Sequence, residues 1–257
     1  MAASSSFSSK SILIRKVDYG EADNIVTFFT EESGKLTAFA RNAKKSKKRF
    51  GTSLDLAAFV NAHFSFKKNH SHMPSLNSVT VIGNFEQIRK DLIKIASASY
   101  MMELFYEMTA ENVKNRNLFY FLHSFLESLN RDEIKTTLLP IYAVKFMRII
   151  GLGPNFKECS YCGESQGLSK TFFVFSRGGI VCSKCIYKNK DEFSPLKPET
   201  FNILSKEESM GENFLKRLTP TNASAYELKW IVNKFVEFHL GKSLNSYRFM
   251  EELNGRP

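Results

Sequence analysis

Cys159-Ser160-Tyr161-Cys162 and, after 19 further residues, Cys182-Ser183-Lys184-Cys185 contain all four cysteines of this 257-residue chain. Each CxxC pair forms a tight turn that directs two sulfurs toward one point, and four thiolates complete the tetrahedral shell that Zn²⁺ prefers. The spacing therefore predicts one zinc ion bound by Cys159, Cys162, Cys182 and Cys185. A closed four-sulfur site leaves no position for water, so we expect the metal to fold its segment rather than to catalyse.

Two disulfides or a thioredoxin-type redox pair are the alternative interpretations of the same cysteines. The residues around them favour zinc. Gly163 follows the first pair, Gly178 and Gly179 precede the second, and residues 171–175 between them have the composition of a strand. Two turns joined by a short strand bring the pairs together, and no cysteine is left over.

Composition indicates the number of domains and the class of partner. With 43% hydrophobic residues and 257 positions, the chain can bury a sizeable core and suits two domains better than one. Lys and Arg number 36 against 26 Asp and Glu, which gives a formal net charge of +10. Such an excess indicates a polyanionic partner, either nucleic acid or an anionic membrane surface. No apolar run approaches the length of a bilayer span, which favours nucleic acid over membrane.

The start of the chain is rich in serine and has neither the charged nor the apolar region of a signal peptide. We expect residues 1–10 to be disordered or to have been added by cloning. Without a secretion signal, and with cysteines that look metal-bound, the expected location is the reducing cytoplasm.

Five β-branched or aromatic-rich runs predict strands at residues 11–17, 24–30, 35–41, 55–67 and 76–83. In the fourth run, Val60, Ala62 and Phe64 alternate with other residues, as expected for a strand with one buried face. Five short strands without a helical crossover predict a small Greek-key barrel such as the OB-fold over residues 11–84. An SH3-like barrel would give a similar pattern.

A basic loop separates the third and fourth of these strands. Residues 41–49 contain six cations and no acid. Their mutual repulsion makes the loop costly to hold compact unless an anion such as phosphate neutralises it, although a merely solvated loop is the alternative. The predicted DNA-binding residues are Arg41, Lys44, Lys45, Lys47, Lys48 and Arg49, extended by Lys67 and Lys68.

Aromatic residues lie close to this loop in the sequence. They could offer stacking surfaces for bases, although each one is individually more typical of a core residue. The candidates are Phe39, Phe50, Phe64 and Phe66.

From residue 85 onward the apolar residues follow helical spacing, which returns at 197–206 and 225–240 after the cysteine segment. Gly151 and the pair Gly153-Pro154 are expected to end the helix that precedes the cysteines. The predicted fold is therefore α+β. A five-stranded OB-fold barrel at 11–84 is followed by a helical domain at 85–257, with a zinc-binding insertion at about 155–190.

Several stretches occur in an order that resembles the bacterial RecO family of recombination mediators. They are Tyr19-Gly20-Glu21-Ala22-Asp23-Asn24-Ile25-Val26, Phe29-Thr30-Glu31-Glu32-Ser33-Gly34-Lys35, the basic loop, Gly151-Leu152-Gly153-Pro154, Cys159-Ser160-Tyr161-Cys162-Gly163 and Phe238-His239-Leu240-Gly241-Lys242. The resemblance implies an N-terminal OB-fold and a helical C-terminal domain that carries a zinc-binding segment. It maps the family's basic loop and zinc cysteines onto the residues named above.

The same resemblance implies binding of single- and double-stranded DNA and annealing of complementary strands. It also implies partnership with RecR and with the acidic C-terminal tail of single-stranded DNA-binding protein, in support of RecA loading. No residue of this chain is assigned to the pocket for that tail.

The sequence offers little for catalysis. It contains no GxxxxGK[ST] phosphate loop. The acidic pairs Glu31-Glu32, Asp132-Glu133 and Glu207-Glu208 are expected to be solvated surface charges, and His70 and His72 to belong to a polar turn. We therefore expect a non-enzymatic protein. An RNA-binding zinc protein and, less favoured, a metal-dependent nuclease are the alternative functions.

Overall fold

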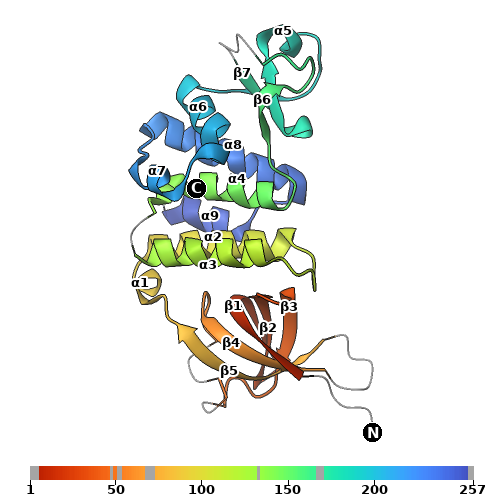
Figure 1. Cartoon of the computed structure of the whole chain (residues 1–257), viewed down its shortest axis with the longest axis vertical. Helices are drawn as coiled ribbons and strands as arrows, with labels where there is room; N and C mark the ends of the chain where they lie inside the picture. Colours follow the sequence, from red (N-terminus) through yellow and green to blue (C-terminus); the bar gives the residue numbers. More distant parts are fainter. Residues whose placement is uncertain are drawn as a thin grey trace. The chain divides into compact units, whose positions relative to one another are not determined.

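The computed structural model describes residues 6–46, 49–50, 54–66, 73–131, 134–165 and 171–253. By compactness the chain divides into two units, Met1–Arg131 and Asp132–Pro257. Unit 1 contains the strands of the barrel and three helices, and unit 2 contains the cysteine segment and the remaining helices (Figure 1). The domain boundary expected at residue 84 stays a prediction, because this division follows packing and not the change from strands to helices.

Unit 1 begins with a closed five-stranded barrel in the order β1-β2-β3-β5-β4, in which β1 also pairs with β4. All neighbours are antiparallel except β3 and β5, which meet in a parallel bridge. This is the predicted OB-fold. Its strands are β1 (Ser6–Tyr19), β2 (Asp23–Thr30), β3 (Gly34–Ala40), β4 (Phe59–Ser65) and β5 (Ser75–Gly83).

The interior of the barrel is filled by the alternate side chains of its strands. Val60, Ala62 and Phe64 of β4 are each 0% exposed, as their alternation in the sequence predicted. Phe50 reaches the same core from the end of the basic loop. The loop is therefore anchored at its C-terminal end by burial of an aromatic ring.

Strand β1 starts earlier than expected. Residues 6–10 pair with β4 from Ser6 opposite Ser65 to Lys10 opposite Asn61, so the expectation that they are disordered was wrong. Backbone pairing does not require apolar side chains, and the one large apolar residue, Phe7, stacks on Phe64 at 5.3 Å between ring centroids. Ser11 is fully buried, and its hydroxyl is satisfied by the carbonyl of Ser9 at 2.9 Å.

Three helices of unit 1 follow the barrel: α1 (Glu86–Arg89), α2 (Leu92–Met108) and α3 (Arg116–Asn130). Asp91 and Asn115 cap α2 and α3 by accepting backbone N–H groups, which explains where both helices begin. The helices α2 and α3 lie along one end of the barrel (Figure 1). Phe105 of α2 packs edge-to-face on Phe29 of β2 with 4.9 Å between ring centroids.

The turn between β2 and β3 is tied to the segment that joins α2 to α3. Glu32 forms ion pairs with Lys114 and Arg116, and Tyr120 donates a hydrogen bond to Glu31. These two acids were expected to be solvated charges, but each has a partner more than 80 positions away in the sequence.

Unit 2 is helical around the cysteine segment. Helix α4 ends as predicted, with Gly151 at a φ of 84° and the N–H of Leu152 bonded to the carbonyl of Met147 at 2.8 Å. Across the described ranges, no helix combines the length and hydropathy that crossing a bilayer requires. The elements are η1 (Thr136–Leu138), α4 (Leu139–Ile149), α6 (Pro198–Lys206), η3 (Glu207–Ser209), α7 (Glu212–Arg217), α8 (Asn222–Leu240) and α9 (Asn245–Leu253).

Glu207 is not the solvated charge that its sequence context suggested. Its side chain is 1% exposed and pairs with Arg148 of α4 at 3.1 Å. Burial raises the pKa of the Glu207 carboxyl despite this cation. Arg148 also donates to the carbonyl of Pro154, so the pair fixes the entry into the cysteine segment. Glu208, the next residue, is half-exposed. Nothing in the sequence indicates that one of these two adjacent acids is buried and the other is not.

The cysteine segment folds into a four-stranded sheet in the order β6-β8-β7-β9. It extends to residue 195, beyond the predicted limit near 190, because β9 pairs with β7. On one face, Phe173 packs on Phe235 of α8 with 5.4 Å between ring centroids. The opposite face carries the cysteines. We call residues 155–195 the metal module; it comprises β6 (Asn155–Cys159), β7 (Thr171–Val174), η2 (Phe175–Arg177), β8 (Gly179–Cys182), α5 (Ser183–Ile186) and β9 (Phe193–Pro195).

Candidate metal centre and nucleic-acid interface

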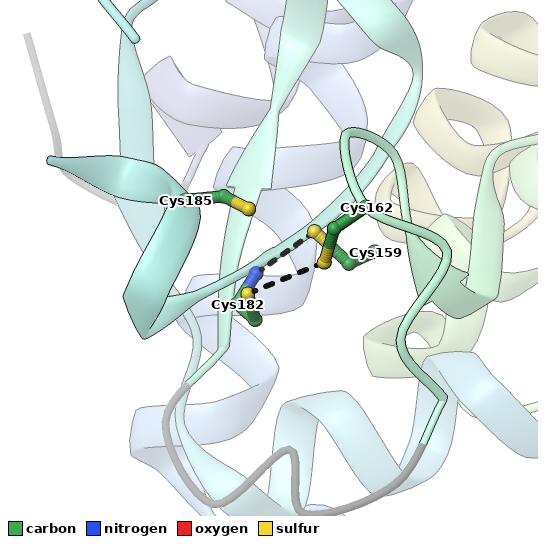
Figure 2. Close-up of side chains that lie close together, drawn as sticks. All are labelled: Cys159, Cys162, Cys182 and Cys185. Atoms are coloured by element: carbon green, nitrogen blue, oxygen red, sulfur yellow. Dashed lines mark hydrogen bonds between the residues drawn. The ribbon is translucent and has the colours of Figure 1, made fainter. Parts of the chain in front are cut away.

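Four sulfurs converge at one point of the metal module (Figure 2). Cys159 ends β6 and Cys162 lies in the turn after it, whereas Cys182 ends β8 and Cys185 lies in α5. All four sulfur atoms lie within 4.8 Å of one another. The predicted grouping of the two CxxC pairs is therefore present in the structure.

The spacing of the sulfurs fits a metal ion. A tetrahedral Zn–S shell with bonds of about 2.3 Å places neighbouring sulfurs about 3.8 Å apart. The sulfurs of Cys162 and Cys182 are 3.8 Å apart. All four cysteines are free thiols, and a disulfide would hold two sulfurs at about 2.05 Å. The site can hold a metal ion, and the structure does not contain the two disulfides of the alternative interpretation.

The electrostatics of the four sulfurs also favour a bound cation. Burial raises the pKa of Cys159, but backbone N–H groups, including that of Cys182 at 3.4 Å, outweigh it and lower the pKa to about 6. Burial and the three neighbouring sulfurs raise the pKa of Cys185 to about 12. Four thiolates this close together would repel one another, and a cation bound among them would stabilise the charged forms.

Glycines allow the two cysteine turns to approach each other. Gly163 closes the first turn with a φ of 70° and donates its N–H to the carbonyl of Cys159 at 2.9 Å. A Cβ on Gly179 would lie 2.5 Å from the hydroxyl oxygen of Ser160 and 2.9 Å from the carbonyl oxygen of Asn155. The turn glycines noted in the sequence thus have a steric role at this site.

A second group of side chains supports the first cysteine turn from outside. Tyr161 donates a hydrogen bond to Asp191, which also accepts one from Ser176 at 2.7 Å. The guanidinium of Arg177 lies 4.3 Å from the centre of the Tyr161 ring. Sequence reasoning missed these contacts, because Asp191 is 30 positions from Tyr161 and nothing in its surroundings marks it.

The basic loop is partly neutralised by the neighbouring hairpin. Lys44 forms an ion pair with Asp18 at 3.0 Å and donates to the carbonyl of Gly20. The Arg49 guanidinium donates to the carbonyl of Arg41 at 2.6 Å, which braces the loop across its base. The loop contains no acid of its own, but an acid from β1 relieves part of its repulsion. Lys44 and Arg49 therefore have structural partners.

Two of the predicted DNA-binding cations are exposed and free. Arg41 and Lys45 have no ion-pair partner among the residues that the structure describes. The other predicted cations, Lys47, Lys48, Lys67 and Lys68, lie outside the described residues, as do His70 and His72.

The aromatic residues near the loop divide between the barrel core, which was the expectation for each one individually, and the surface. Phe50 and Phe64 are 1% and 0% exposed and belong to the barrel core, so they cannot stack on bases. Tyr19, which sequence reasoning did not select, is 56% exposed and lies edge-on to the partly exposed Phe39 at 5.6 Å between centroids. In the sequence, the alternation of Val17 and Tyr19 at the end of β1 is the pattern that could have identified this exposed ring.

These side chains form one surface on the outside of the barrel. Val17 pairs with Ile25, which pairs with Phe39, so the three residues lie in a row across β1, β2 and β3. Tyr19 lies two positions beyond Val17 and therefore points to the same face. Phe39 is the penultimate residue of β3, and the basic loop begins at Arg41 directly after that strand, so the row adjoins the start of the loop. We call Val17, Tyr19, Ile25 and Phe39 the outer aromatic surface.

Groups that could bind a catalytic metal are limited. Within the described ranges, the four cysteines are the only cluster of three or more Cys, His, Asp or Glu side chains that could hold a metal ion. A two-metal nuclease needs convergent carboxylates, and the described part of the chain offers none.

Both halves of the chain match family models. The model described as "Recombination protein O N terminal" matches residues 1–85, and "Recombination protein O C terminal" matches residues 89–248. The two models divide the chain close to the change from strands to helices.

Relatives named DNA repair protein RecO match almost the whole chain. The protein of Anaeromyxobacter sp. (strain K) is 31% identical over 242 residues, which cover 94% of each chain. That of Myxococcus xanthus is 31% identical and covers 94% of this chain and 96% of the relative. That of Listeria monocytogenes serotype 4b is 30% identical over 246 residues, 95% of this chain and 93% of the relative.

The OB-fold barrel, the four-cysteine cluster and the matches over both halves agree with one another. The chain therefore belongs to the RecO family and is a DNA repair protein of that family.

Proposed function

We propose that the protein acts without catalysis as a recombination mediator. In this role it binds single- and double-stranded DNA, anneals complementary strands and, with RecR, helps to load RecA onto DNA coated by single-stranded DNA-binding protein. The acidic C-terminal tail of that protein is a further proposed partner, the cytoplasm the proposed location, and Zn²⁺ the proposed ion of the four-cysteine site. Membership of the RecO family and the net charge of +10 support this role.

The observation that carries the DNA-binding part is the outer aromatic surface beside the basic loop. OB-folds bind nucleic acids through the face of strands 2 and 3 and the neighbouring loops. Tyr19 and Phe39 offer ring surfaces there, and Arg41 and Lys45 offer positive charge that no described residue pairs with. A stacking surface beside a basic track is the arrangement by which proteins bind single strands with little sequence preference. We propose that bases stack on this surface while phosphates lie along the loop.

Lys44 and Arg49 have partners within the protein, which makes them poorer candidates for phosphate contacts than the other cations of the loop. We propose a variant that replaces Arg41, Lys45, Lys47 and Lys48 by Gln and leaves the paired Lys44 and Arg49 in place. Each phosphate contact to a single strand contributes about 0.7 to the slope of log affinity against log salt. The variant should bind a short oligonucleotide more weakly at low salt and lose up to roughly 3 units of that slope. Annealing of complementary strands should slow in parallel, with or without ATP.

Lys44→Gln is the matched control, because its charge is already paired with Asp18. It should change affinity and slope far less than the quadruple variant does. Equal affinity and slope for the folded quadruple variant and the parent would contradict the proposed role of the loop. Competition with RNA of the same sequence tests the RNA-binding alternative. A strong preference for RNA would replace DNA as the proposed ligand.

A further inference from the structure

One aromatic side chain of the metal module is almost entirely exposed. Tyr187, directly after α5, is 90% exposed, more than any other large apolar side chain in the described ranges. Its ring has no aromatic or hydrogen-bonding contact with any described residue. The backbone beneath it is fixed, because the N–H of Lys188 and the side-chain amide of Asn189 both donate to the carbonyl of Cys185. The ring is thus presented on a rigid turn.

Three exposed lysines lie within three positions of Tyr187 in the sequence. Lys184, Lys188 and Lys190 are exposed, and none has an ion-pair partner among the described residues. Of the two acids that follow, Asp191 is occupied by Tyr161 and Ser176, which leaves Glu192 as the single exposed acid. The surface around Tyr187 therefore has a clear excess of positive charge.

An exposed aromatic ring among unpaired lysines matches the chemistry of a single-stranded nucleic acid. The lysines attract phosphates, and the ring stacks on an unpaired base whatever its identity. In a duplex the faces of the bases are occupied by their neighbours, so the ring favours a single strand. A stable protein interface would need a broader apolar patch, whereas here one ring stands among charges.

We propose that Lys184, Tyr187, Lys188 and Lys190 form a second contact for single-stranded DNA, in which one base stacks on Tyr187. The proposal builds on the DNA-binding function proposed above but rests on different residues in the other unit. One chain then has two separate single-strand contacts, at the barrel and at the metal module. This is the minimum that a protein needs to hold two strands, or two parts of one strand, at once.

The test compares Tyr187→Ala with Tyr187→Phe in the full-length, metal-loaded protein. Binding of an oligothymidylate is measured by fluorescence anisotropy at low salt. The alanine variant should lose about fivefold or more in affinity, the lower range for removing one stacked base, and the phenylalanine variant should bind like the parent. Tyr226→Ala is the matched control, because Tyr226 is a half-exposed tyrosine of α8 that lies beside Glu227. It should leave affinity unchanged.

A second measurement locates the contact directly. An oligonucleotide that contains 5-iododeoxyuridine is crosslinked by light, and the modified peptide is identified by mass spectrometry. Crosslinking at Tyr187 supports the proposal. Parental affinity of Tyr187→Ala together with crosslinks confined to the barrel would overturn it and leave the function proposed for the barrel intact. Failure of the unmodified protein to bind any oligonucleotide would overturn both.

Discussion

The barrel and the metal module achieve stability by different means. The barrel encloses a continuous cluster of buried apolar side chains to which all five strands contribute. On its cysteine face, the described part of the metal module buries a cluster of four residues, three of which are cysteines: Cys159, Val181, Cys182 and Cys185. Apolar burial stabilises the first region, whereas we expect the second to depend on an ion bound by its four cysteines, because little apolar surface is buried on that face.

The opposite face of the metal module does have an apolar core, so the contrast applies only to the cysteine face. Phe173 is 1% exposed and packs on Phe235, and Phe175 lies 6.0 Å from Trp230 between ring centroids. Both partners belong to α8, so this face obtains its core from the helices of unit 2. We therefore expect a bound metal to stabilise one face of the small sheet and not the whole unit. Loss of metal should loosen the cysteine turns more than the strands that lie on α8.

The largest effect should come from removing a cysteine. Cys159→Ser should release the metal, because three remaining thiolates cannot close a tetrahedral shell, and structural zinc contributes about 10–16 kcal/mol to the folding of isolated zinc-finger peptides. Hydrogen exchange should accelerate at residues 159–165 and 182–193, less at β7, and not in the barrel. Elemental analysis should find one zinc per parent chain and a much smaller amount in the variant.

Ser183→Ala is the control, because Ser183 is exposed and lies between two cysteines without supplying a sulfur. It should retain the metal and the parental exchange rates. The contrast between the two regions would be false if Cys159→Ser kept its protection at the cysteine turns, or if its barrel loosened to the same degree.

A glycine in unit 1 should give the next largest effect. Gly34, at the start of β3, has a φ of 66°, and an added Cβ would lie 1.9 Å from the backbone carbonyl oxygen of Val113. Gly34→Ala should lower the free energy of unfolding of unit 1 by roughly 2–6 kcal/mol, through the combined cost of backbone strain and forced displacement. Chemical denaturation followed by fluorescence and circular dichroism measures the change, and the zinc content should stay at the parental level.

Gly20→Ala separates strain from steric clash. Gly20 has a φ of 57°, but nothing lies within 4 Å of an added Cβ. This variant should lose only about 1–3 kcal/mol, the cost of the left-handed backbone alone. Equal losses in the two variants would show that the close approach of Gly34 to Val113 contributes nothing to the stability of unit 1.

The parts of the structure that could be predicted depend on local patterns. Alternation along β4 identified Val60, Ala62 and Phe64 as core, and the spacing of the cysteines identified a site whose four sulfurs come from Cys159, Cys162, Cys182 and Cys185. Glycine after α4 marked the end of that helix. In each case the physical requirement acts on residues close together in the sequence, so the pattern is visible without the fold.

The parts that were missed depend on distant partners. Glu207 and Glu208 are adjacent in the sequence, but only the side chain of Glu207 is buried, where it pairs with Arg148 of α4. Asp191 supports Tyr161 from 30 positions away. Residues 6–10 contain three serines and become a strand because β4 offers them backbone partners. Exposure of Tyr19 and burial of Phe50 likewise depend on how the barrel closes.

The smallest expected effect concerns the ion pairs between the barrel and the segment that joins α2 to α3. It tests whether charge contributes to the stability of a unit that does not contain the metal site. Hydrogen bonds from Lys114 and Arg116 lower the pKa of the Glu32 carboxyl below its ordinary value of 4.5. A carboxyl whose pKa is lower in the folded state stabilises the fold above its unfolded pKa, and this contribution is lost as the pH falls through the folded value. Glu32→Gln should therefore be slightly less stable than the parent at pH 7.

The difference in melting temperature between the parent and Glu32→Gln should shrink as the pH falls below about 4.5. It should also shrink at high salt, because Glu32 and its partners are partly exposed and their attraction is screened. Glu21→Gln, in the turn between β1 and β2, serves as the control and should show neither dependence. A difference that persisted unchanged at pH 3 and in 1 M salt would mean that Glu32 acts through packing and not through charge. These ion pairs would then add nothing to the apolar burial that stabilises unit 1, and its contrast with the metal module would be sharper.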